Sequence, residues 1–160
     1  MTMPRWIFLA SAAVVAAAVQ AADKVQTIPP ERVANYWLLD PDSAEANVPN
    51  SGYNIHDSGC AAVAYVIEKD GSTSHVKLMR LVPQSELGKT AVGIVAGMRF
   101  VPAKQNLGKD SIYTYVVIPF NLPDAASKDP ADRATRERVL ASCKLEGFGG
   151  KPGEDVIRVH

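Results

Sequence analysis

The residues of this chain best suited to chemistry are its two cysteines, Cys60 and Cys143, and the histidines near the first of them. A thiolate with a histidine as its base is a nucleophilic pair, so Cys60 with His56 or His75 suggests a thiol enzyme. His56, Asp57 and Cys60 together suggest a metal site, although a structural zinc site needs four ligands. In an exported protein, two cysteines most simply form one disulfide bond, which removes the thiolate that both alternatives need.

The N-terminus bears on this choice, because residues 1–21 have the features of a bacterial secretory signal. Arg5 precedes the apolar stretch Trp6 to Val19, and Val19-Gln20-Ala21 fits the small-residue cleavage rule. The stretch is shorter than the roughly 20 apolar residues of a membrane span, and an inner-membrane anchor is the alternative. We therefore expect a periplasmic protein with a cleaved signal and a Cys60–Cys143 disulfide.

Charge and motifs argue against several other classes of function. Lys plus Arg and Asp plus Glu both number 17, so net charge gives no reason to expect nucleic acid as a partner. No Gly-rich phosphate loop, nucleophile elbow or pair of carboxylates in a cleft is recognisable. We expect no catalytic residue, metal site, cofactor or small-molecule substrate. The charged residues of a late helical segment predict a solvated, salt-bridged face: Asp132, Arg133, Arg136, Glu137 and Arg138.

The elements that would position these residues begin with a segment that has little periodicity. Residues 22–58 contain Pro29-Pro30, Pro41 and Pro49, and only residues 31–39 are apolar enough for a short helix or strand. This pattern predicts an extended lead-in that packs on the domain without organising it.

The central part of the chain has a clear hairpin pattern over residues 61–81. Val63, Tyr65 and Ile67 alternate with smaller apolar residues, which predicts a strand with one bulky and one small apolar face. Asp70-Gly71 supplies the positive φ angles of a tight turn. A second strand follows, with a polar face typical of an antiparallel sheet open to water.

The period then changes, and residues 85–98 predict a helix with its apolar stripe toward the sheet. Residues 99–101 predict a short strand, and residues 112–122 the longest strand of the chain. Pro119 cannot donate a hydrogen bond within a ladder, which indicates an edge strand or a bulge.

Residues 123–160 predict a C-terminal helix and a tail. Asp129-Pro130 is a typical start of a helix, which we expect to end near Leu145, before a tail of little signal from Gly149 to His160. The disulfide would tie this helix to the first strand. The predicted fold is therefore α+β, a small antiparallel sheet of about three strands with a packed helix, plus a C-terminal helix.

The order of these elements resembles the TonB C-terminal domain over about residues 59–122. The most specific signature is Arg99-Phe100 followed by Pro102-Ala103, and the strand ending Ile118-Pro119-Phe120 is also similar. The resemblance implies a module that binds protein partners by strand addition, because in this family the edge of the last strand takes a short segment of an outer-membrane receptor. The residues that would flank such a peptide are Tyr113, Tyr115 and Val117. The alternative is that this edge is covered, by residues 23–58, by the helix that begins at Asp129 or by a second copy of the chain.

Two features of a TonB energy transducer have no counterpart here. A transducer has an uncleaved N-terminal membrane helix and a long Pro-rich spacer, and neither residues 1–21 nor residues 22–58 fit these parts. Met98 also stands where the family commonly has Trp. We expect a periplasmic interaction module and, as a further expectation from the resemblance, a link to TonB-dependent transport. The alternatives are a structural envelope protein that dimerises through its sheet edge and, if the signal is not cleaved, a membrane-anchored transducer.

Overall fold

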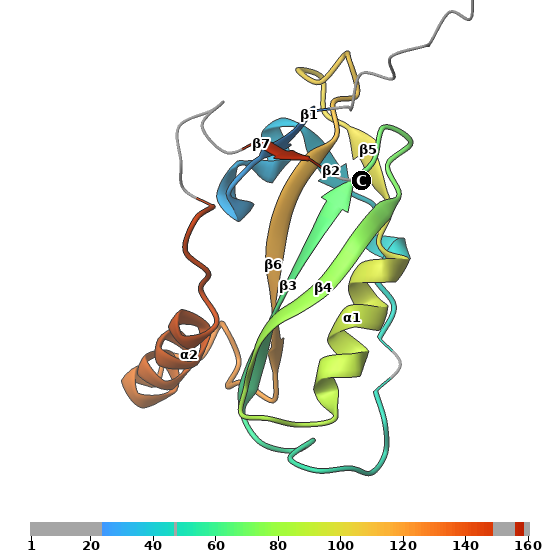
Figure 1. The fold of residues 1–160 in the computed structure, drawn as a ribbon. Coiled ribbons are helices and arrows are strands. Elements are labelled where there is room, and N and C mark those ends of the chain that lie inside the picture. The colour runs from blue at the N-terminus through green and yellow to red at the C-terminus, as the bar shows by residue number, and fades with distance from the viewer. Residues whose placement is uncertain (1–23, 47, 149–155, 159–160) are drawn as a thin grey trace, which may run out of the picture.

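The computed structural model of the chain describes residues 24–46, 48–148 and 156–158 (Figure 1). The predicted signal, residues 1–21, lies outside the described residues. The helices and strands, with η for a 3-10 helix, are β1 (Lys24–Thr27), η1 (Pro30–Asn35), β2 (Trp37–Leu39), η2 (Pro41–Ser43), β3 (Gly59–Ile67), β4 (Thr73–Val82), α1 (Leu87–Gly97), β5 (Phe100–Pro102), β6 (Ile112–Phe120), α2 (Pro130–Ser142) and β7 (Val156–Arg158). Within these described parts, no helix has the length and apolar character needed to cross a membrane.

The main sheet has five strands in the order β4-β3-β6-β1-β7. β3 pairs antiparallel with both β4 and β6, so the predicted antiparallel sheet of about three strands and the α+β class are confirmed. β1 adds to β6 in parallel, and β7 adds to β1 in antiparallel orientation. β2 and β5 form a separate two-stranded sheet.

The lead-in contributes more to the fold than its sequence predicted. β1 and β2 each join a sheet, Ile28 is fully buried and Trp37 is only 1% exposed. The indole N–H of Trp37 donates a hydrogen bond to the carbonyl of Asp110 at 2.9 Å. The prediction that residues 22–58 do not organise the domain is therefore wrong. Strands of three and four residues are too short to produce a periodic signal.

The turn of the hairpin between β3 and β4 fits closely against β5. Gly71 has φ +83°, and its carbonyl accepts a hydrogen bond from the amide of Phe100 at 2.8 Å. The carboxylate of Asp70 accepts hydrogen bonds from the amide and hydroxyl of Ser72. Side chains larger than hydrogen are excluded at Gly71, because a Cβ there would lie 2.0 Å from the Phe100 carbonyl oxygen.

β4 is the outer strand beside β3, and several features make its free edge unsuitable for pairing. Its register with β3 shifts twice along the ladder, and His75 lies within the strand at φ +51°. Lys77 and Arg80 add positive charge along it. Irregular register and charge are common devices against edge-to-edge association.

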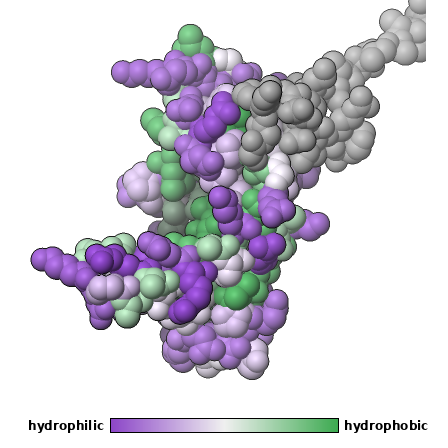
Figure 2. All heavy atoms as spheres, turned by 90° about the vertical axis from the view of Figure 1, so that its left-hand side faces the viewer, coloured by the Kyte–Doolittle hydropathy of each residue, from purple (hydrophilic) through white to green (hydrophobic). Residues whose placement is uncertain are grey.

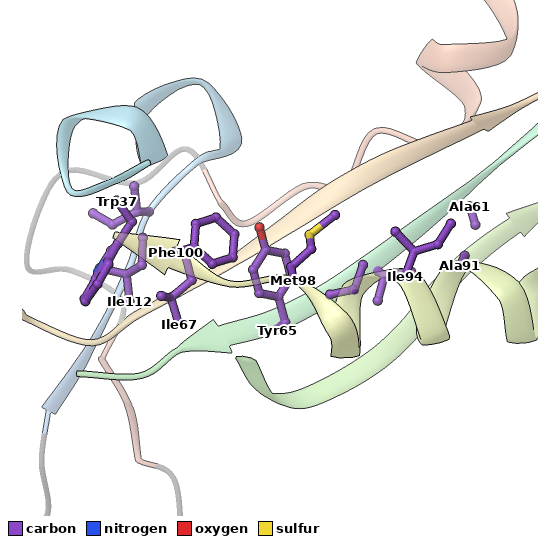
Figure 3. Packing of buried hydrophobic residues seen from close by; sticks show 12 residues of the cluster. Trp37, Ala61, Tyr65, Ile67, Ala91, Ile94, Met98, Phe100 and Ile112 are labelled. Atoms are coloured by element: carbon purple, nitrogen blue, oxygen red, sulfur yellow. The ribbon is translucent and has the colours of Figure 1, made fainter. Parts of the chain in front are cut away.

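α1 covers one face of the sheet and forms the larger core with it (Figures 1 and 3). The bulky residues of β3 point to this face, where Tyr65 is 4% exposed and stacks on Phe100 with ring centroids 6.1 Å apart. The predicted apolar stripe of the helix is buried against them: Leu87, Ala91, Ile94, Val95 and Met98. Because the glycines of α1 weaken it as an isolated helix, this packing must stabilise it.

The opposite face of the sheet carries a smaller cluster that holds the C-terminal part of the chain. Cys60, Ala62 and Ala64 of β3 pack there with Tyr115, Cys143 and Phe148. α2 begins as predicted, with the Asp129 carboxylate accepting from the Ala131 amide at 2.8 Å. The helix has no buried residue of its own. Its position therefore depends on the contacts near its C-terminal end.

The tail contains a strand that its sequence did not predict. Residues 156–158 form β7, with Arg158 opposite Lys24 and Val156 opposite Gln26. Three residues give too little alternation to be recognised as a strand. The remainder of the predicted tail, residues 149–155 and 159–160, lies outside the described residues.

Candidate functional site

β6 was predicted to be an edge strand, and this is wrong for its first residues. β1 pairs in parallel with β6, placing Gln26 opposite Ile112 and Thr27 opposite Tyr113. The amide of Ile28 then donates to the carbonyl of Tyr113 at 2.8 Å. The backbone of Tyr113, a predicted peptide contact, is therefore already paired within the chain.

Among the described residues, no strand pairs with the edge of β6 beyond this point, because β1 ends and the chain enters η1 at Pro30. The register between β3 and β6 has no shift from Ile112 to Phe120. In an antiparallel strand the backbone groups of successive residues point alternately to the two sides. The Tyr113 carbonyl points away from β3, so the N–H and C=O groups of Tyr115 and Val117 do so as well. Pro119 has the same orientation and lacks an N–H.

A groove of about 490 Å³ follows this uncovered stretch between η1 and α2. Val116 and Val117 both line it, although their side chains point to opposite faces of the sheet. The backbone edge itself therefore lies in the groove. Figure 2 faces this side of the molecule and shows α2 as a largely hydrophilic arm that projects beside apolar surface. The other lining residues are Pro30, Glu31, Tyr115, Pro119, Arg136, Leu140, Ala141 and Lys144.

The two tyrosine side chains predicted to flank a peptide pack instead against the C-terminal part of the chain. The rings of Tyr113 and Tyr115 lie 5.2 and 4.7 Å from that of Phe148, centroid to centroid. The Tyr115 hydroxyl accepts a hydrogen bond from the Leu145 amide at 3.2 Å. Partial burial raises the pKa of the Tyr113 phenol. Tyr115 and Val117 thus border the groove mainly with their backbone, and the side chain of Val117 is half-buried.

One wall of the groove comes from residues that sequence reasoning did not assign to the site. Leu140 and Ala141 reach it from the last turn of α2, Arg136 from the preceding turn, and Lys144 from just beyond the helix. Arg136 was predicted to belong to a salt-bridged face. Its guanidinium instead donates to the carbonyl of Pro123 at 3.2 Å, and none of the described carboxylates forms an ion pair with it. No local pattern could reveal this wall, because it depends on where α2 docks.

The docking of α2 is fixed by a disulfide bond between Cys60 and Cys143. The sulfurs are 2.02 Å apart, the Cα atoms are 6.2 Å apart, and the bond joins residues 83 positions apart in the sequence. Both cysteines are fully buried. Arg80 adds a second link, because its guanidinium donates to the carbonyls of Ser142 and Lys144 at 3.1 and 2.9 Å. α2 is therefore tied both to β3 and to β4.

The residues considered for chemistry are not arranged as a catalytic or metal site. Cys60 carries no thiol in the disulfide, so it cannot act as a nucleophile with His56 or His75. Nδ1 of His75 lies 2.9 Å from the Ser74 hydroxyl on β4. Over residues 24–46, 48–148 and 156–158, no group of three His, Cys, Asp or Glu side chains could hold a metal ion.

The signature residues of the resemblance join parts of the fold and lie outside the groove. The Arg99 guanidinium donates to the carbonyls of Ala96, Gly97 and Met98 at the end of α1, a favourable place for a cation. The remaining signature residues contact the hairpin turn and the lead-in. Phe100 bonds to the turn at Gly71, Pro102 is paired with Trp37, and the Ala103 amide donates to the Tyr36 carbonyl at 2.9 Å.

A larger hollow of about 1010 Å³ lies between α1 and the lead-in segment 45–53. Its charged residues include Glu86 and Lys89, whose side chains pair with each other at 3.3 Å. No strand of the main sheet lines it, so it offers no backbone ladder to a partner.

The family comparison matches this architecture. Residues 55–122 match the family model described as the C-terminal of the Gram-negative bacterial TonB protein. No curated protein and no solved structure matches the chain. The matched residues extend from just before β3 to just after β6. The two boundaries of the groove, η1 and α2, lie outside the matched residues.

Proposed function

We propose that the protein binds an extended segment of another envelope protein along β6, on the premise that residues 55–122, which match the model of the TonB C-terminal domain, act as an interaction domain. The family match confirms the resemblance found in the sequence. The partner segment, such as that of an outer-membrane receptor, would add as a further strand beside Tyr115 and Val117.

The observation that carries this proposal is the uncovered stretch of β6 at the floor of the groove. Backbone N–H and C=O groups that point into a groove are unused donors and acceptors for an extended peptide. β1 stops at Thr27 and Pro119 has no amide, so the binding stretch runs from Tyr115 to Pro119. At about 3.3 Å per residue this distance accommodates a peptide of about four or five residues.

The experiment uses the mature chain, residues 22–160, in its oxidised form. A peptide copying the energy-coupling segment of an outer-membrane receptor is titrated while the amide resonances of β6 are followed by NMR. We expect saturable shifts at Tyr115 and Val117 and none on the outer strand β4. Shifts that are absent from β6, or equal on both strands, would contradict the proposal.

Two variants of Val117 separate a backbone interaction from a side-chain contact. Val117→Pro removes the N–H that points into the groove, and Pro119 shows that a proline in this orientation is accommodated in β6. Val117→Ala retains the N–H and shortens the side chain. We expect the proline variant to lose binding about two- to tenfold, as one lost hydrogen bond of about 0.5–1.5 kcal/mol implies, and the alanine variant to lose much less. Equal losses would argue against strand addition.

Two alternatives are decided by independent measurements. A structural protein that dimerises through its sheet edge would give a stable dimer in size-exclusion chromatography, unaffected by the peptide. Location in the periplasm is supported by the signal-like residues 1–21, and N-terminal sequencing of the native protein tests it. We expect Ala22 or Asp23 at the N-terminus. An intact Met1 would indicate an inner-membrane anchor and would favour energy transduction.

A further inference from the structure

The groove beside β6 has a wall that the TonB C-terminal domain does not supply. α2 and the residues after it form this wall, and they lie beyond residue 122, where the family match ends. A strand added to β6 would direct alternate side chains toward this wall and the others toward the opposite face of the sheet. The chemistry of the wall therefore determines which side chains a partner can place there.

The wall combines a small apolar surface with two cations. Leu140 and Ala141 provide the apolar part, and Arg136 and Lys144 stand on the same wall. Within the described residues, neither cation forms an ion pair with a carboxylate. Of the described carboxylates, Glu31 alone lines the groove, and it belongs to η1 on the opposite side. A partner side chain that faces α2 thus meets two cations beside apolar surface, with Glu31 across the groove and Glu146 in the adjoining hollow that Lys144 also lines.

We infer that the partner of this groove is an extended peptide segment with a carboxylate side chain directed at Arg136 and Lys144, flanked by apolar side chains on the same face. This inference rests on the proposed function and specifies the chemistry of its partner. Arg136 retains free N–H donors, since it has one carbonyl partner at Pro123, and Lys144 is exposed. Both can therefore receive a carboxylate without breaking an existing ion pair.

The test compares three blocked heptapeptides that differ only at their central residue. The first has the sequence Thr-Val-Thr-Glu-Thr-Val-Thr, which places Val, Glu and Val on one face, and the others carry Gln or Lys in place of Glu. We expect the Glu peptide to bind the oxidised mature chain about two- to fivefold more tightly than the Gln peptide at low salt, the range of a partly exposed ion pair. The Lys peptide should bind most weakly, and the differences should shrink in 1 M salt.

Two matched variants test whether the preference for the Glu peptide depends on the wall formed by α2 and the residues after it. Lys144→Gln should abolish most of the difference between the Glu and Gln peptides, whereas Lys77→Gln on β4 makes the same change in net charge away from the groove and should leave it intact. Equal binding of the three peptides to the parent chain would overturn the inference and leave the proposed function standing. Equal effects of the two lysine variants would also overturn it, because net charge alone would then explain the preference. If no peptide shifts the amides of Tyr115 and Val117, the inference and the proposed function both fail.

Discussion

Opening the Cys60–Cys143 disulfide should release α2 from the sheet and lower the stability of the whole domain. The bond joins residues 83 positions apart. For a loop of this length the chain-entropy model gives about 4.5 kcal/mol, because the open chain gains conformational freedom when it unfolds. Domains of this size are stable by only about 5–15 kcal/mol, so the loss is large.

The structure predicts that part of this loss appears first at α2. The helix has no buried residue. Its remaining anchors are the hydrogen bonds of Arg80 and Arg136, the packing of half-buried Val139 on the smaller cluster, and the contacts of Leu145 and Phe148 with Tyr115. Without the disulfide these contacts can open while the core under α1 stays intact. Any population of such an opened state makes the measured loss smaller than about 4.5 kcal/mol.

The assay combines urea unfolding with hydrogen exchange of the α2 amides. Fluorescence of the buried Trp37 reports global unfolding, and exchange in residues 130–142 reports release of the helix. The double variant Cys60→Ala/Cys143→Ala should unfold at lower urea and exchange faster in α2, and reductant should bring the parent toward the same behaviour. Reductant should have no effect on the double variant. A stability loss below about 1 kcal/mol together with unchanged protection of α2 would refute the reasoning.

Four further outcomes are expected from unfolding of single variants, two of them followed as a function of pH. Gly71→Ala should lose at least about 2 kcal/mol, because the turn needs a positive φ and has no room for a methyl group, whereas Gly93→Ala in the exposed part of α1 should gain up to about 1 kcal/mol. Burial raises the pKa of the Tyr65 phenol in the folded state. Its contribution to the free energy of unfolding is therefore present below the unfolded-state pKa of about 10 and is lost at higher pH. Tyr65→Phe should resist alkaline unfolding better than the parent. Hydrogen bonds from the hydroxyl and then the amide of Ser72 lower the pKa of Asp70, so its contribution is present above the unfolded-state pKa of about 3.9 and lost as pH falls further. Asp70→Asn should thus lower stability at pH 7 and reduce its dependence on pH below about 4. Contrary pH trends, or a stable Gly71→Ala variant, would contradict these arguments.

The parts of the fold that could be predicted are those whose signals are local and repeated. Three features have a pattern that can be read within one segment, without knowing which segments pack beside it. They are the nine residues of β3, the Asp70-Gly71 turn and the apolar stripe of α1. The same holds for the start of α2 at Asp129. The short strands could not be predicted, for the opposite reason. β1 and β7 have few residues, and their positions beside β6 and each other exist only once the sheet has formed.

The candidate site likewise has parts that the sequence predicted and parts that it did not. Sequence alone indicated the family and predicted the strand now seen as β6 as the binding element, with Tyr113, Tyr115 and Val117 on it. It could not establish that β1 covers Tyr113, that the tyrosine side chains support α2, or that Lys144 stands beside the groove. The type of each element follows from local backbone preference and hydrophobic period, which a sequence contains directly. Which part of an edge stays open depends on contacts between distant segments, here across a disulfide that spans 83 positions, and only the tertiary structure determines those.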